Sequence, residues 1–110
     1  MVIVEDYVKV SKEVFTPLAE LVRIGLFKDE KDALREIILE QAGHKIAHYK
    51  HEVGKLERKY GVEFTDFKAR IEKRKDAEIF TEWDDYIQWA SYEEALRYWI
   101  EVEERVKAHP

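Results

Sequence analysis

The stretch between Asp29 and Gly61 constrains the fold more than any other, because it contains no firm helix stop. Asp29 suits the N-cap position, where a carboxylate can accept a backbone N–H of the first turn. Apolar residues then recur at alternating spacings of four and three: Ala42, Ile46, Tyr49, Val53, Leu56 and Tyr60. This spacing predicts one helix of about 30 residues that packs lengthwise against another helix, despite Gly43 and Gly54 in its interior.

A shorter helix is expected before this stretch, with Gly25 as its end, since glycine readily takes the left-handed conformation that closes helices. Its start is open between two N-caps, Ser11 and Thr16, the second of which is followed by Pro17 at the first helical position. Its apolar face comprises Val14, Leu18, Leu21 and Val22.

Two further helices are expected after Gly61. Phe64, Phe67 and Ile71 predict a short one. A last helix is expected to start at Thr81, with a possible interruption at Ser91.

The first ten residues are the one segment that favours a β-strand. Val2, Val4, Val8 and Val10 are β-branched. A lone strand leaves its backbone donors and acceptors unpaired unless another chain supplies a partner. The expected fold is therefore mainly α with one short N-terminal β-strand, through which two copies form a homodimer.

One strand followed by two helices, joined through Gly25-Leu26-Phe27, resembles the ribbon-helix-helix family of antitoxins and repressors. The resemblance is carried by residues 8–10, 21–27 and 29–37. The C-terminal part is similar to tails of small archaeal antitoxin-like proteins, on residues 59–61, Phe64, Phe67 and 83–89. Together the two resemblances imply a ribbon-helix-helix dimerisation module over 1–42 and a helical, toxin-binding extension over 43–110.

The family reads operator DNA with the outward face of its strand, which in this sequence carries Tyr7, Lys9 and Ser11. Lys9 could bond to guanine acceptors. Family members also hold a phosphate at the start of the second helix, where Asp29 and Glu30 would repel it here. DNA binding and a purely dimerising module both remain open.

Acidic and aromatic residues gather in the C-terminal part. From Asp76 to Glu104 there are ten acids and one base, Arg97. Aromatic residues in acidic surroundings favour docking of a basic protein partner. The candidate partner-binding residues are Trp83, Tyr86, Ile87, Trp89 and Trp99. The alternative is that these side chains fold back onto the long helix as core, and both roles can coexist in different residues.

Metal binding and catalysis find little support in the sequence. His44, His48 and His51 have helical spacing suited to a metal, but no carboxylate or cysteine completes the set, so a solvated stripe is favoured. No phosphate-binding loop or catalytic triad is recognisable, so neither an enzyme nor a cofactor is expected.

We therefore expect a type II antitoxin that occludes a basic toxin through its C-terminal helices, while repression of its own operon through the ribbon stays open with DNA binding. The alternatives are a stand-alone transcriptional regulator and a structural homodimer that binds no DNA. The absence of Cys and Asn and of any long apolar run indicates a cytoplasmic protein from a hot environment, with no membrane segment.

Overall fold

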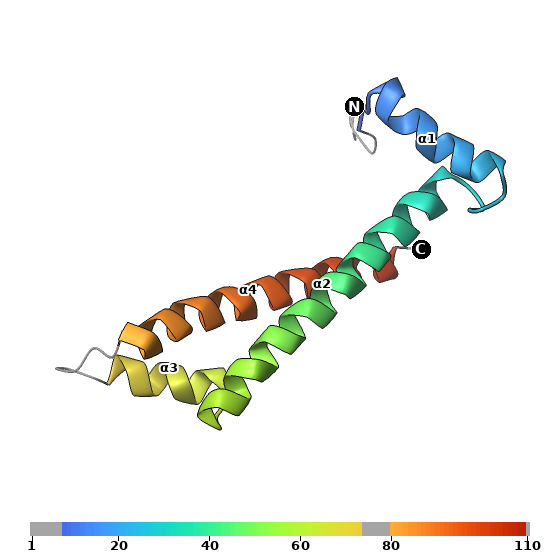
Figure 1. The fold of residues 1–110 in the computed structure, drawn as a ribbon. Coiled ribbons are helices and arrows are strands. Elements are labelled where there is room, and N and C mark those ends of the chain that lie inside the picture. The colour runs from blue at the N-terminus through green and yellow to red at the C-terminus, as the bar shows by residue number, and fades with distance from the viewer. Residues whose placement is uncertain (1–7, 74–79, 110) are drawn as a thin grey trace, which may run out of the picture. The chain divides into compact units, whose positions relative to one another are not determined.

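The computed structural model describes residues 8–73 and 80–109, which form four helices and contain no strand (Figure 1). The helices are α1 (Lys12–Arg23), α2 (Glu30–Tyr60), α3 (Phe64–Glu72) and α4 (Phe80–Ala108). The mainly α class is correct.

The prediction of an N-terminal strand is wrong for the described part of that segment, Val8–Val10, which leads directly into α1. Met1–Tyr7 lies outside the described residues. A strand requires a paired neighbour, and no second segment in 8–73 or 80–109 is extended to provide one. The strand half of the ribbon-helix-helix module therefore has no counterpart in these residues.

Of the two possible starts for α1, the structure has the earlier one, with Ser11 at the N-cap. Pro17 lies inside the helix, where its missing N–H costs one backbone hydrogen bond. The helix ends as predicted at Gly25, whose φ is +87°. The N–H of Leu26 donates to the Leu21 carbonyl and that of Gly25 to the Val22 carbonyl, both at 3.0 Å, which is the Schellman pattern.

The predicted long helix is confirmed, because α2 runs for 31 residues without interruption. Asp29 caps it, since its Oδ1 accepts the Asp32 backbone N–H at 2.7 Å. At the other end Gly61 takes a φ of +68°, and its N–H donates to the Glu57 carbonyl at 2.7 Å. The interior glycines do not break the helix.

The described residues divide into two compact units, 8–37 and 38–109, and the boundary falls within α2. In the second unit, α4 runs antiparallel to α2 (Figure 1). Tyr49 contacts Tyr92, with ring centroids 6.0 Å apart, and Tyr60 stacks on Trp89 at 6.1 Å. The predicted seam of α2 does pack against another helix, with Ala42, Val53 and Leu56 buried and Ile46, Tyr49 and Tyr60 half-buried.

Aromatic side chains dominate the core of the second unit. Its buried residues come from three helices and are Val53, Leu56, Phe67, Ile71 and Trp89. Helix α3 contributes Phe67 and Ile71 to this core, as its apolar spacing predicts. Helix α4 passes through Ser91 without a break, so the possible interruption there does not occur. The core thus fixes one face of α4 against α2 and α3.

Candidate protein-binding face of the C-terminal helix

Helix α4 has two faces of different character. The inner face carries Tyr86, Trp89 and Tyr92, which pack in or against the core. At 100° per residue, the opposite side carries a row of exposed side chains. We call this row the outer stripe; it consists of Phe80, Trp83, Asp84, Ile87, Ser91, Glu94, Tyr98, Glu101 and Arg105.

The four apolar members of the outer stripe are large and well exposed. Phe80 is 77% exposed, Trp83 47%, Ile87 53% and Tyr98 58%. Phe80, Trp83 and Ile87 follow one another at spacings of three and four residues, so they form a continuous apolar patch over two turns of helix. Such a patch on a helix is a feature of interaction surfaces.

The acids of α4 also divide between the faces. On the inner side Asp85 pairs with Lys59 at 2.6 Å, and Glu82 accepts a hydrogen bond from Arg70 at 2.7 Å. Within the described residues, Asp84, Glu94 and Glu101 of the outer stripe form no ion pair. The outer stripe therefore combines apolar surface with three acids and one base, and none of these acids is paired within the described residues.

The inner ion pair is part of a polar clamp between α2 and α4, formed by Lys59, Tyr60 and Asp85. The Tyr60 hydroxyl and the Lys59 ammonium both donate to Asp85 Oδ2. Burial alone would raise the pKa of Asp85, but these two hydrogen bonds and the Lys59 charge outweigh it and lower the pKa. The pKa of Tyr60 is raised, first by burial and then by its bond to Asp85. The clamp fixes the lengthwise register of α4 on α2.

The five predicted partner-binding residues lie in different environments. Trp83 and Ile87 belong to the outer stripe. Tyr86 is half-buried and stacks on Phe64, with centroids 5.9 Å apart and planes 7° apart. Trp89 is completely buried and so has no surface for a partner to contact. Trp99 is half-buried with its ring edge-on to Tyr98 at 5.3 Å.

Two exposed residues of the outer stripe, Phe80 and Tyr98, were not among the predicted site residues. Their spacing in the sequence places them on the same face of a helix as two predicted residues. Phe80 lies three residues before Trp83, and Tyr98 lies eleven residues after Ile87. That signal requires knowing that α4 is continuous through Ser91, and the structure supplies this.

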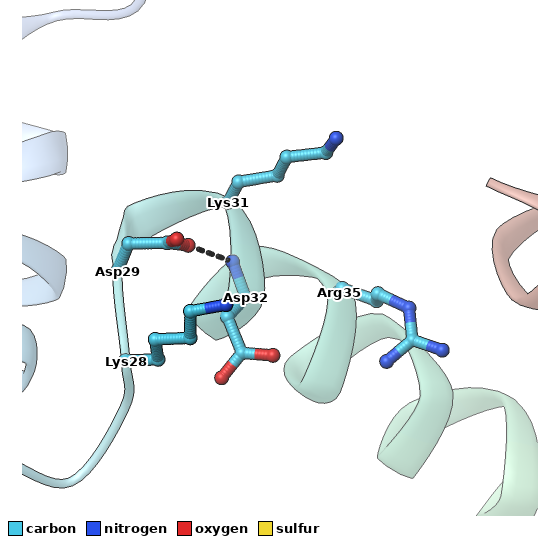
Figure 2. A pocket seen from close by; sticks show the side chains of 5 residues that line it. All are labelled: Lys28, Asp29, Lys31, Asp32 and Arg35. Carbon is cyan, nitrogen blue, oxygen red and sulfur yellow. Dashed lines mark hydrogen bonds between the residues drawn. The ribbon is translucent and has the colours of Figure 1, made fainter. Parts of the chain in front are cut away.

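Of the predicted DNA-contacting residues, Tyr7 lies outside the described residues, while Lys9 and Ser11 are exposed before α1. Near the start of α2, a hollow of about 290 Å³ is lined by three bases and two acids (Figure 2). The lining residues are Lys28, Asp29, Lys31, Asp32 and Arg35. In this hollow the Asp32 backbone N–H already donates its hydrogen bond to the Asp29 carboxylate (Figure 2). That donor is therefore not available to a phosphate.

The three histidines of α2 are all exposed. His44 Nε2 lies 3.8 Å from a carboxylate oxygen of Glu40 one turn earlier. Over residues 8–73 and 80–109, no group of three or more His, Asp or Glu side chains is arranged to hold a metal ion. No helix in that part of the chain is both long and apolar enough to span a bilayer.

Comparison of the chain with protein-family models, with curated proteins and with solved structures gives no match.

Proposed function

We propose that this protein is a non-catalytic, cytoplasmic binding protein of the antitoxin type, which docks a basic toxin protein on the outer stripe of α4. The observation that carries the proposal is the coincidence of a two-turn apolar patch, Phe80 to Ile87, with acids that form no ion pair within the described residues. Apolar surface alone would favour any partner, whereas the acids select a basic one.

The two kinds of residue would contribute differently to binding. Trp83 and Phe80 offer large rings of the type that dominates binding energy when fully desolvated at the centre of an interface. Asp84, Glu94 and Glu101 would raise the association rate with a positively charged surface, an effect that salt weakens. Inhibition by such a protein is steric and electrostatic, since a covered toxin groove cannot receive its substrate.

Operon repression through a ribbon does not form part of this proposal. The β-ribbon mode of DNA reading needs paired strands, and the described residues contain none.

The test is capture of partners from the native cell extract at moderate salt, with three purified baits. They are the wild-type chain, the double variant Trp83→Ala/Ile87→Ala, and Gln88→Ala as a matched control that changes an exposed polar residue of the same helix. We expect one small basic protein to be retained stoichiometrically by the wild-type chain and by the control. Its affinity, measured with the purified partner by calorimetry, should fall at least about tenfold in the double variant.

The same calorimetric titration repeated at rising salt should show weakening affinity, since the acids contribute long-range attraction. Retention of no basic protein would overturn the antitoxin proposal. Equal affinity of the wild-type chain and the double variant would overturn the assignment of the outer stripe.

A further inference from the structure

The part of α2 that belongs to the second unit carries a row of basic side chains along one side. At 100° per residue, five of them fall within an arc of about 80°. This arc lies opposite the buried Ala42, Val53 and Leu56, the side on which the core of the unit forms. All five side chains are exposed. We call this row the basic face of α2; it consists of His44, His48, His51, Lys55 and Arg58.

Acids lie only at the borders of the basic face. Glu40, one turn before His44, has its carboxylate 3.8 Å from the His44 ring and lies at the N-terminal limit of the face. Glu52 lies at one edge, is half-buried and pairs with Lys55 at 3.2 Å. Arg58 forms no ion pair within the described residues. Between His44 and Arg58 the arc itself contains no acid.

The charge of the basic face depends on pH, because three of its five members are histidines. At pH 7.5 its permanent charges are those of Lys55 and Arg58, and Glu52 offsets one of them. Histidine side chains take up their proton just below neutral pH. Protonation of all three therefore adds three positive charges along a stretch of helix about 21 Å long.

The composition of this face favours a phosphate backbone over a protein as its ligand. Protein interfaces depend on large apolar side chains at their centre, and the basic face has none, unlike the outer stripe of α4. A phosphate backbone is bound mainly by positive charge. Unpaired bases also stack on aromatic side chains, histidine among them. At 3.4 Å per nucleotide of one strand, the face has the length of about six nucleotides.

We propose that the basic face of α2 binds single-stranded nucleic acid, and that it binds more tightly as the pH falls from 7.5 to 6. Lys55 and Arg58 hold backbone phosphates at one end of the face. The three histidines offer their rings to unpaired bases and, once protonated, their charge to further phosphates. This inference is independent of the proposed function, since it concerns a different helix and a different class of ligand.

The test is fluorescence anisotropy of a labelled twelve-nucleotide oligouridylate, titrated with the full-length chain at low salt. The affinity of the wild-type chain should rise at least about tenfold from pH 7.5 to pH 6. In the variant His44→Gln/His48→Gln/His51→Gln the rise should be less than about twofold, because the charges that attract phosphates at pH 6 are gone. His109→Gln changes the remaining histidine of the chain, so it is the matched control and should keep the rise.

Competition by unlabelled chains at pH 6 identifies the class of ligand. Oligothymidylate of the same length distinguishes RNA from DNA, and displacement by either single strand supports the proposal. Equal or stronger displacement by polyglutamate of the same charge would overturn it, since the face would then accept any acidic chain. Tighter binding of a duplex of the same length would also overturn it, because paired bases are not free to stack on the histidine rings.

Two results of the direct titration would refute the proposal as well. One is the absence of oligonucleotide binding at pH 6, and the other is a rise in affinity that the triple variant retains. If the triple variant loses helix by circular dichroism, nuclear magnetic resonance of the wild-type chain decides. The ring protons of the three histidines of α2 should then shift when the oligonucleotide is added at pH 6, while those of His109 should not. Unchanged positions of all three would refute binding at this face.

Discussion

At the scale of single residues, Trp83 and Trp89 show how two tryptophans six positions apart acquire opposite roles. Trp89 is completely buried among Tyr60, Phe64 and Phe67, with ring centroids 5.2–6.1 Å away. Its indole N–H has no hydrogen-bond partner in the structure, so its contribution to stability comes from packing. Trp83 is about half exposed.

Trp89→Ala should therefore lower the free energy of unfolding by about 3–5 kcal/mol, the usual cost of deleting a large buried ring. Trp83→Ala should lower it by no more than about 1 kcal/mol, because its site is open to solvent. Urea denaturation followed by circular dichroism measures both. Similar losses for the two variants would contradict this division between core and surface.

At the scale of the elements, Gly25 and Gly43 differ in whether their backbone conformation requires glycine. Gly25 closes α1 with a φ of +87°, a conformation that strains any residue with a Cβ. Gly43 is solvent-exposed and lies far from either end of α2, and a Cβ added there would meet no atom within 4 Å. The residue type is the same, but the backbone conformation differs.

Gly25→Ala should destabilise the protein by about 1–2 kcal/mol, the penalty of left-handed backbone for an L-residue. Gly43→Ala should stabilise it by about 0.5–1 kcal/mol, the usual gain from replacing glycine within a helix. Thermal denaturation of the two variants beside the wild type provides the measurement. A stabilising Gly25→Ala would mean that the Schellman end of α1 does not persist in solution.

At the scale of the whole molecule, the clamp of Lys59, Tyr60 and Asp85 links stability to pH. Lys59 and Asp85 are 26 positions apart, so the clamp exists only in the folded state. It lowers the pKa of Asp85 below the ordinary value of 3.8. Below about pH 5 the unfolded chain thus takes up a proton here more readily than the folded chain, and stability falls as the pH drops.

Asp85→Asn should lower the free energy of unfolding by about 1–2 kcal/mol at pH 7. This is less than a buried charged hydrogen bond would contribute, because the Lys59 side chain is half exposed and water screens its charge. The difference in unfolding free energy between wild type and variant should shrink as the pH falls from 5 to 3. Urea titrations at pH 7, 5, 4 and 3 test this. A constant difference across that range would show that the Asp85 charge is not what stabilises the clamp.

Local sequence signals determined the helices of this protein. The Asp29 cap, the Gly25 and Gly61 ends and the heptad seam from Ala42 to Tyr60 all act within a few residues, or within one helix, and the structure has each of them. The prediction of an N-terminal strand was wrong because local signals are not sufficient to form a strand. A strand depends on hydrogen bonds to a distant segment or another chain, and β-branched residues do not supply that partner.

Only the tertiary structure decided which aromatic residues form the core. The sequence does not distinguish the large apolar side chains of α4, which are Trp83, Tyr86, Ile87, Trp89 and Trp99. The packing of α4 on α2 and α3 buries Trp89 and leaves Trp83 and Ile87 exposed. The rotation of α4 about its axis is set by contacts with Tyr60, Phe64 and Phe67, residues far away in the chain. Helical periodicity defines the faces of a helix, whereas the neighbours that cover one of them are chosen by the fold.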